Sequence, residues 1–545
     1  MFYVRPHANR SFAKALGQQA IGSSAKTNFW FFVLGLLCLP QRLVCAGDVV
    51  EFSHSDQLQK GESRIDARDL RRHVTTLSSD AFEGREAGGR GGKAALAYLR
   101  SELKAIRQNG SLPRESTQDF GREYQNLLVL LPGSDERLKR EVVIVGAHYD
   151  HVGYGNAKNS AGPIGFIHNG ADDNASGTSA VLELIEAFSS LETAPARSIL
   201  FAFWDAEEAG LLGSKHWVSY PTIPLHDIRF VMNIDMLGRL RDNRLVTVGW
   251  RSAPGLRSLL VSHNTDNELK LAFQPKVIAD SDHYYFYAAG IPAVHIDTDK
   301  HEDYHRPSDD PEKINWSGLL AVTHFAYRVI DDVANRSEIP QFRREALKES
   351  APGWMTTQPA VSPPIRFGVN WDPELAKKNI AQVAQLTPDS PAAIAGLRVG
   401  DRITRLGPWE NGTFEDLKTT MQIVSNPVLI RVNRAGVEVP FDVRAHFWGS
   451  PIRLGAGWIE DPALPNCVAV THVMAESPAD RGGLVAGDVI LEMGGHPISS
   501  ADEFKQRVID ESGPLHLRVE RQGRIRDIKI DLFDRSLTNL GSAIP

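Results

Sequence analysis

Five short groups of histidine and carboxylate residues stand out between residues 148 and 309 of this sequence. Histidine nitrogens and carboxylate oxygens are ligands that Zn²⁺ accepts, and there are enough of them here for a pair of ions. Two metal ions held about 3.5–4 Å apart activate water and polarise a carbonyl, which is hydrolytic chemistry. The groups are His148-Tyr-Asp150, Asp172-Asp173-Asn174, Glu207-Glu208, Asn233-Ile-Asp235 and Tyr304-His305 with Asp309.

Taken singly, each group also has a structural explanation. A His-x-Asp pair such as His148 and Asp150 occurs by chance in many proteins, although residues i and i+2 of a strand do point to the same side. The pair Asp172-Asp173 precedes an amphipathic stretch, where aspartate is a preferred N-cap, but a cap needs only one acid. A metal site is favoured because the groups recur at equivalent places in the predicted fold.

Four of the five groups follow short apolar runs that are typical of strands buried on both faces. The runs are residues 142–146, 198–204, 229–234 and 291–296, and residues 178–188 carry a helical apolar stripe. Their alternation over residues 66–335 predicts an α/β fold with a mostly parallel sheet and helices on both faces. The carboxyl ends of such strands form the crevice where ligands bind, so we expect the carboxylates to converge there.

These residues resemble the M28 family of zinc aminopeptidases over about residues 66 to 335. Five motifs match in order, and the segment around Glu83-Gly84-Arg85 resembles the stretch before the catalytic core in bacterial members. The resemblance implies two zinc ions per chain, held by five ligands. These are His148 and Asp235 on one ion, Glu208 and His305 on the other, and Asp173 as the bridge between them.

The same resemblance implies roles for two further carboxylates. Glu207 is expected to be the general base and acid, and Asp150 the group that orients the imidazole of His148. Asp173, and not Asp172, is taken as the bridge because Asp173-Asn174-x-Ser176-Gly177 aligns with the Asp-Asn-x-Ser-Gly of the family.

The other histidines of this region receive no ligand role. We expect them in packing, at the surface or beside the ligands, and His283 is the one expected nearest to a bound substrate. These histidines are His151, His168, His283, His295, His301 and His324. The aromatic run at 284–287 is expected to be core, with a wall of the substrate crevice as the alternative.

Behind a proline-rich linker at 336–365, the chain repeats itself. Ser390-Pro391-Ala392 recurs as Ser477-Pro478-Ala479, 87 residues later. A Gly-Leu-x-x-Gly-Asp element that ends at Asp401 recurs at the same offset and ends at Asp488. This periodicity predicts two tandem domains.

The two copies, residues 366–446 and 451–534, resemble PDZ domains in the arrangement found in bacterial exported proteases. Such domains bind peptide tails by adding a strand to a sheet edge. The second copy carries more of the pattern. For the first copy, a closed and purely structural groove is an equal alternative to peptide binding.

The beginning of the chain bears on its location. Residues 1–46 contain no acid, and several basic residues precede an apolar run at 29–39 that is shorter than the roughly 20 residues needed to span a bilayer. We expect an export signal cut before Gly47, which leaves a domain at 47–335 in the periplasm or outside the cell. An uncleaved membrane anchor is the alternative, and only then is membrane contact expected.

Composition excludes several classes of protein. With 67 acidic and 60 basic residues the formal charge is −7, so nucleic acid is not an expected partner. Three cysteines are too few for a disulfide framework.

The motifs and the resemblance together imply an exported aminopeptidase that removes N-terminal residues from peptides, with the PDZ copies recruiting or regulating substrate. One alternative is an enzyme like the glutaminyl cyclases, which resemble this fold but use a single zinc ion. Another is a catalytically silent adaptor that binds C-terminal peptide tails. The full set of five ligand positions favours the aminopeptidase.

Overall fold

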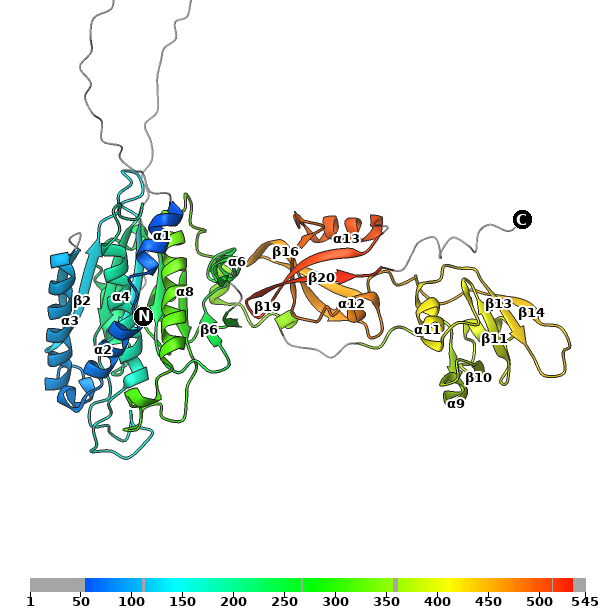
Figure 1. The fold of residues 1–545 in the computed structure, drawn as a ribbon, viewed down its shortest axis with the longest axis horizontal. Coiled ribbons are helices and arrows are strands. Elements are labelled where there is room, and N and C mark those ends of the chain that lie inside the picture. The colour runs from blue at the N-terminus through cyan, green and yellow to red at the C-terminus, as the bar shows by residue number, and fades with distance from the viewer. Residues whose placement is uncertain (1–53, 110–112, 266–267, 356–360, 512, 533–545) are drawn as a thin grey trace, which may run out of the picture. The chain divides into compact units, whose positions relative to one another are not determined.

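The computed structural model describes residues 54–109, 113–265, 268–355, 361–511 and 513–532 (Figure 1). The predicted signal or anchor segment, including Cys38 and Cys45, lies outside these residues. Cys467 is buried. In the described part of the chain, no helix is long and apolar enough to cross a membrane.

An eight-stranded sheet forms the centre of the first domain, with strand order β1-β2-β4-β3-β5-β8-β6-β7. The central pairs β4–β3, β3–β5 and β5–β8 are parallel. These are the four strands that the apolar runs predict, so the expected α/β fold is confirmed. The strands are β1 Arg114–Phe120, β2 Tyr124–Leu131, β3 Val142–His148, β4 Ser198–Trp204, β5 Ile228–Ile234, β6 Arg244–Val248, β7 Lys270–Gln274 and β8 Ala293–Asp297.

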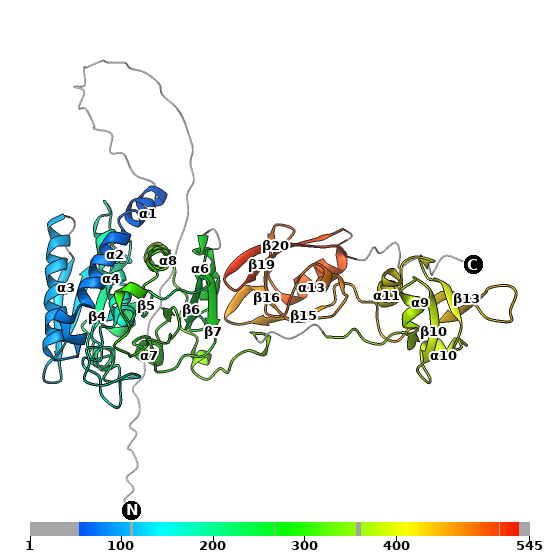
Figure 2. The same cartoon turned by 60° about the horizontal axis from the view of Figure 1, so that its bottom comes forward.

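Helices cover both faces of this sheet (Figure 2). Along β3, Val143 and Val145 belong to the core on the face covered by α4 and α8. Ile144 points the other way and packs with Trp217 of α5 and Phe286 of α7. The helices are α1 His54–Glu62, α2 Ala67–Leu77, α3 Arg90–Asn109, α4 Gly177–Ser189, α5 Leu212–Ser219, α6 Leu256–Ser262, α7 His283–Ala288 and α8 Trp316–Asn335.

Each C-terminal repeat forms a six-stranded sheet of the same plan. The first has the order β14-β13-β11-β10-β9, and the second the order β15-β16-β17-β19-β20, each with a short extra strand on its third member. The first repeat contains β9 Val369–Trp371, α9 Pro373–Ala376, β10 Ala381–Leu386, α10 Pro391–Ile394, β11 Arg402–Leu406, β12 Trp409–Glu410, α11 Phe414–Ile423, β13 Val428–Asn433 and β14 Phe441–Ala445. The second contains β15 Ala456–Asp461, β16 Leu464–Val473, α12 Pro478–Arg481, β17 Val489–Met493, β18 His496–Pro497, α13 Ala501–Asp510, β19 Leu515–Arg521 and β20 Arg524–Ile530.

The repeated motifs have the same structural role in both copies. Ser477 is the N-cap of α12, where its side chain accepts a hydrogen bond from the backbone of Asp480, and Ser390 caps α10 in the same way. The buried Asp488 carboxylate pairs with Arg521 at 2.6 Å. Asp401 pairs with its own arginine at 2.7 Å. The motifs recur because each fold needs the same cap and the same buried ion pair.

The first part of the predicted linker packs against the first domain. Phe342 contacts Tyr287 edge to face, with ring centroids 5.5 Å apart, and the Tyr287 hydroxyl donates to the carbonyl of Ala346. Short turns at Arg344–Leu347 and Gly353–Met355 complete this segment.

A buried acid between α2 and α4 makes the stability of this domain depend on pH. Glu183 of α4 is 1% exposed, and one of its oxygens lies 3.6 Å from His73 of α2. Burial raises the pKa of Glu183 to about 7 and lowers the pKa of His73 to about 4. A raised pKa means that the folded state prefers the neutral acid. The stability that protonated Glu183 contributes to the folded state is therefore lost as the pH rises towards 7 and above.

We therefore expect Glu183→Gln to be more stable than wild type at pH 8, by about 1–3 kcal/mol in the free energy of unfolding, and so to unfold at a higher temperature. At pH 5 the two proteins should be equally stable. Gln keeps the oxygen that accepts from the backbone N–H of Asp66. Thermal denaturation at both pH values measures the difference. The control is Glu136→Gln on the surface, where the side chain is 88% exposed and should show no such pH dependence. Equal shifts at the two pH values would contradict the expectation.

Candidate metal centre

Residues from five places in the sequence meet at the carboxyl edge of the central sheet. His148 is the last residue of β3, Glu207 follows β4, and Asp235 follows β5. Asp173 lies in the turn before α4, and His305 lies in the loop after β8. The parallel strands all end at this edge, and for that reason the side chains lie close together.

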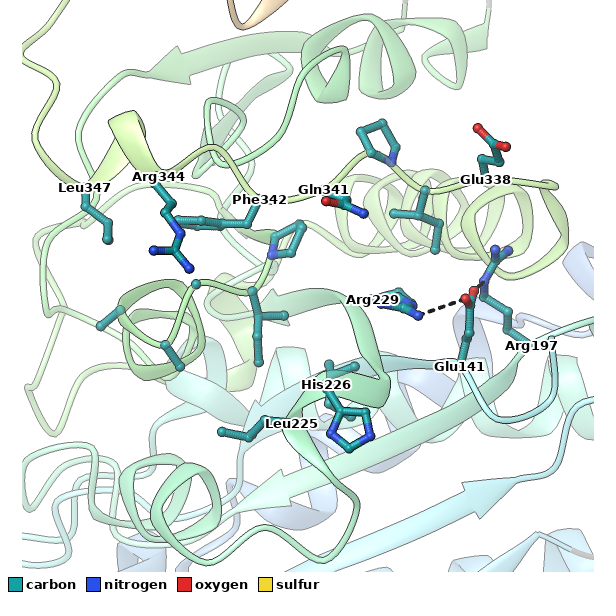
Figure 3. A pocket seen from close by; sticks show the side chains of 18 of the residues that line it. Glu141, Arg197, Leu225, His226, Arg229, Glu338, Gln341, Phe342, Arg344 and Leu347 are labelled. Atoms are coloured by element: carbon teal, nitrogen blue, oxygen red, sulfur yellow. Dashed lines mark hydrogen bonds and ion pairs between the residues drawn. The ribbon is translucent and has the colours of Figure 1, made fainter. Parts of the chain in front are cut away.

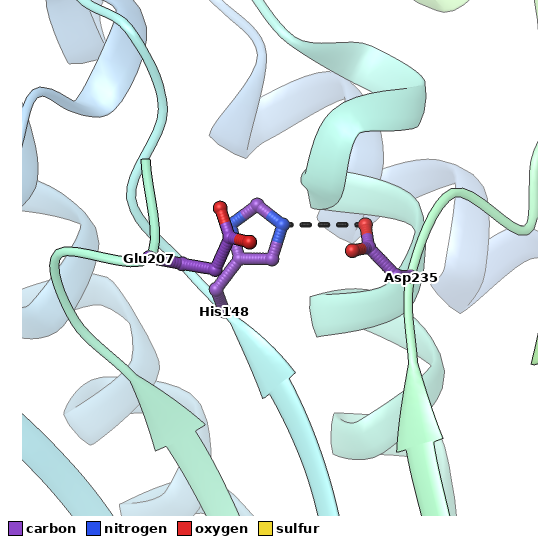
Figure 4. A group of neighbouring side chains, drawn as sticks. All are labelled: His148, Glu207 and Asp235. Atoms are coloured by element: carbon purple, nitrogen blue, oxygen red, sulfur yellow. Dashed lines mark hydrogen bonds and ion pairs between the residues drawn. The ribbon is translucent and has the colours of Figure 1, made fainter. Parts of the chain in front are cut away.

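His148, Glu207 and Asp235 form the first of two groups (Figure 4). Nε2 of His148 lies 3.2 Å from Oδ1 of Asp235. One potential ligand atom from each of the three residues lies within 4.8 Å of the other two. Such spacing fits a single metal ion.

The second group contains Glu208, His305 and His151. Nε2 of His305 lies 3.1 Å from Oε2 of Glu208, and Nδ1 of His151 lies 2.9 Å from Oε1 of the same carboxylate. We expected no ligand role for His151, but the structure places it directly against a predicted ligand. Its only signal in the sequence is its position in the same turn as His148.

Asp173 lies between the two groups and faces both. Its Oδ1 is 3.4 Å from Nε2 of His148, and its Oδ2 is 3.1 Å from Nε2 of His305. The neighbouring Asp172 points elsewhere, since its Oδ2 lies 3.1 Å from His301 and its Oδ1 accepts from the backbone of Gly238. Of the two aspartates, Asp173 has the geometry of a bridging carboxylate.

Asp150 contributes in a different way from the expected one. Its Oδ1 is 3.8 Å from Nδ1 of His148, whereas that nitrogen lies 3.2 Å from the Asp150 carbonyl oxygen. The carboxylate accepts hydrogen bonds from the backbone N–H groups of Glu207 and Glu208, at 3.0 and 3.3 Å. Asp150 therefore fixes the turn that carries both glutamates, in addition to lying beside His148.

The two adjacent glutamates have opposite protonation preferences. Burial raises the pKa of Glu207 well above its usual range, against the attraction of His148. Burial also acts to raise the pKa of Glu208, but hydrogen bonds from His151 and His305 outweigh it and lower the pKa. Divergent pKa values in neighbouring acids are typical of a division between a proton-transferring group and a permanently charged one.

The turn that carries Asp173 is held from two sides. Oδ2 of Asp309 accepts the backbone N–H groups of Asp172 and Asp173, both at 3.0 Å. The fully buried guanidinium of Arg85 donates to the carbonyl oxygens of Gly170 and Asp173, at 2.9 and 3.3 Å. It also donates to the carbonyls of Leu77, Tyr149 and Asn169. The position of the central carboxylate is thus fixed through its backbone.

The donor set fits metal ions. Within the described residues, the ion pairs of Asp173, Glu208 and Asp235 are with histidines and not with lysine or arginine. Buried charges are normally paired or bound to metal. Nitrogen and oxygen donors around two centres suit Zn²⁺.

His283, the histidine expected nearest to substrate, is fully buried. Its ring stacks on that of His295, with centroids 4.6 Å apart, and neither of its nitrogens has a hydrogen-bond partner in the described structure. Its neighbour Ser281 instead reaches the site, because its hydroxyl donates to Oδ2 of Asp235 at 2.8 Å.

A cavity of about 1050 Å³ lies at the edge of the sheet opposite the candidate metal centre (Figure 3). Its walls include Glu141, which lies between Arg197 and Arg229, and Phe342 of the linker. Glu141, Arg197 and Arg229 precede or begin β3, β4 and β5. By contrast, His148, Glu207 and Asp235 lie at or after the other ends of these three strands. The cavity is therefore separate from the candidate metal centre.

Comparison with known proteins agrees with this arrangement. Residues 126–330 match peptidase family M28, and residues 470–521 match the PDZ domain. Leupeptin-inactivating enzyme 1 of Streptomyces exfoliatus is 29% identical over 232 residues, which are 42% of this chain and 48% of that protein. Aminopeptidase YwaD of Bacillus subtilis is 26% identical over 223 residues, 39% of this chain and 45% of that protein. The chain spans about half the length of the curated relatives it matches.

Among solved structures, the LapA aminopeptidase of Legionella pneumophila has a TM-score of 0.46 and 20% sequence identity, and the match covers 54% of this chain and 79% of that one. The family match spans β2 to α8 and includes every residue of the candidate centre, and the PDZ match lies in the second repeat. Residues 126–330 of this chain thus match the model of peptidase family M28, and residues 470–521 match the model of the PDZ domain.

Proposed function

We propose that this chain is an exported aminopeptidase with two zinc ions, which removes N-terminal residues from peptides. The observation that carries the proposal is the position of Asp173, whose two carboxylate oxygens face His148 and His305 of the two groups. A carboxylate in that position would serve two metal ions at once. Glu208 and Asp235 complete the ligand set, and His151 supports Glu208.

Zinc bound at these residues would supply Lewis-acid activation of a peptide carbonyl and of a water molecule. The chain itself supplies the proton transfer. Glu207 lies beside His148 and Asp235 but belongs to a different strand end, and burial raises its pKa, which favours a carboxyl group that accepts a proton. It would take the proton of the attacking water and give it to the leaving amine.

The second glutamate is the reason to prefer an aminopeptidase over the single-zinc, cyclase-like alternative. Glu208 and His305 form a complete second group on the far side of Asp173. An enzyme with one ion needs only one of the two groups, and this chain has both. The silent adaptor is disfavoured because every candidate ligand is present and buried or half-buried.

Action at the amino end of peptides is supported by the curated relatives, which are named as aminopeptidases in several cases. Export is supported by the N-terminal sequence pattern alone. The physiological location proposed is the periplasm or the cell exterior.

The second repeat is proposed to bind C-terminal peptide tails. Its strand β15 is an edge strand of the sheet, and helix α13 lies along it, with Trp458 and Phe504 in edge-to-face contact at 4.9 Å. Arg453, in the loop before β15, donates to the carbonyl of Val508 at the end of α13 and holds the helix to that loop. An extended peptide added to β15 would recruit substrate or regulate the peptidase.

Two zinc ions per chain are expected in the purified protein, and about one in Asp173→Asn. The substitution keeps the shape of the side chain but weakens the bridge to both ions. Elemental analysis after dialysis measures the ratio of zinc to protein. A ratio of one in the wild type would favour the cyclase-like alternative, which cyclisation of an N-terminal glutamine would then establish.

Glu207→Gln is expected to lower kcat by about 10²–10⁴-fold while zinc content stays unchanged, since loss of a general base costs that much. Free and N-acetylated peptides are incubated with wild type and variant, and released residues are followed by mass spectrometry. Sequential loss of N-terminal residues from the free peptides alone is the expected pattern for the wild type. Retained activity in the variant would remove Glu207 from its role.

The PDZ proposal predicts tighter binding of peptides with a free C-terminal carboxylate than of the same peptides with a C-terminal amide. Fluorescence polarisation with the full chain measures both. Truncating the side chain at the groove, Trp458→Ala, should weaken the binding of peptides with a free C-terminal carboxylate. Binding of the C-terminal amides should be unchanged. Trp371, which contacts Phe414 in the first repeat, provides the matched control Trp371→Ala. Equal affinity for the acid and the amide would contradict carboxylate recognition.

A further inference from the structure

A cavity of about 260 Å³ opens directly on the candidate metal centre. Asp173, Asp235 and Glu207 line one end of it. This cavity offers space for a neighbouring side chain of a substrate whose scissile carbonyl lies at these residues. If the chain is the aminopeptidase proposed above, on which this inference rests, that side chain belongs to the N-terminal residue.

The floor of the cavity is one face of the sheet. In the antiparallel pair β6–β8, Val248 lies opposite His295, and Val246 lies opposite Asp297. All four residues line the cavity and are at least nine-tenths buried. The alternate residues Thr247 and Ile296, which are also paired, point to the opposite face because successive side chains of a strand alternate.

The polar half of this floor is the contact between His295 and Asp297. Nε2 of His295 lies 3.1 Å from Oδ2 of Asp297, whose Oδ1 accepts the backbone N–H of Asp299 at 2.6 Å. Nδ1 of His295 lies 3.1 Å from the side-chain amide of Asn233. That amide donates to Ser281, which in turn donates to Asp235. A chain of hydrogen bonds therefore links the cavity floor to a predicted metal ligand.

The charges around the rim are balanced in sign. Asp280 and Asp299 carry negative charge, Lys276 and Lys300 carry positive charge, and all four are exposed. Asp299 is paired with Arg244 at 2.7 Å. The rim thus does not favour a cation over an anion, and the buried pair on the floor is the feature that sets the chemistry.

An aliphatic side chain placed on this floor would remove water from His295 and Asp297 without replacing its hydrogen bonds. Burying polar groups in that way is costly, whereas a side chain that donates or accepts restores the lost bonds. Val246 and Val248 remain available to contact the methylene groups of a long side chain.

We propose that His295 and Asp297 determine specificity, so that the enzyme prefers an N-terminal residue with a polar, hydrogen-bonding side chain over an aliphatic residue of the same size. The substrate class is peptides that begin with residues such as glutamine, asparagine or lysine. Leucine, methionine and norleucine are their matched apolar counterparts.

The test compares kcat/KM for three pairs of aminoacyl p-nitroanilides: Gln and Met, Asn and Leu, Lys and norleucine. In the wild type, the best substrate is expected to have a polar side chain. Its kcat/KM should exceed that of its apolar partner by roughly ten- to hundredfold. The double variant His295→Leu/Asp297→Leu, which removes both partners of the contact together, should bring that ratio below one. The single variant Asp297→Asn keeps the shape and should lower the ratio about fivefold if the double variant fails to fold.

The matched control is Thr247→Val. Thr247 is fully buried on the same strand pair but on the opposite face, and its hydroxyl has no hydrogen-bond partner in the described structure. This substitution changes polarity in the sheet without reaching the cavity, so the wild-type ratio should persist.

Two results would overturn the inference in distinguishable ways. Release that is fastest from leucine, methionine or norleucine would overturn the specificity assignment and leave the aminopeptidase proposal standing. No release from any free substrate by the zinc-loaded wild type would contradict the proposed function, and the specificity assignment with it.

Discussion

The cost of gathering several carboxylates away from water is the constraint on which the rest of this domain depends. Asp173, Glu207, Glu208 and Asp235 meet at one edge of the sheet, and unpaired buried charges of the same sign repel one another. The protein surrounds them with histidines, which bind metal, and not with lysine or arginine. An arrangement that neutralised these acids permanently would leave no donor atoms for an ion.

The same constraint explains why many backbone N–H groups near the site donate hydrogen bonds to carboxylates. Asp150 and Asp309 accept hydrogen bonds from main-chain N–H groups of the segments that carry the candidate ligands, so each fixes a loop without competing for metal. The carboxylates that do not face the centre therefore serve to position those that do.

A structural feature can be predicted from the sequence when it leaves a pattern in neighbouring residues. The central strands are predictable because both of their faces are buried, which makes them continuous apolar runs. Strand β1 is an edge strand that is mostly exposed, so its sequence lacks that signal. Four of the five groups of candidates follow predicted strands, and the family resemblance assigns the ligand roles, but the contact of His151 with Glu208 depends on how two loops fold together. The pairing of His295 and Asp297 with Val248 and Val246 depends on strand register, which a single sequence does not specify.

Arg85 ties the segment before the sheet to the centre of the site. Its guanidinium donates to five carbonyl oxygens, including that of Asp173, yet the residue lies 41 positions before the start of the matched family region at residue 126. The start of the matched family region is therefore not the start of the folding unit. A shortened gene product that began at residue 126 would contain every candidate ligand and still leave those carbonyls without their donor. The segment before the sheet, which carries Arg85, is thus needed to hold a centre whose ligands come later in the sequence.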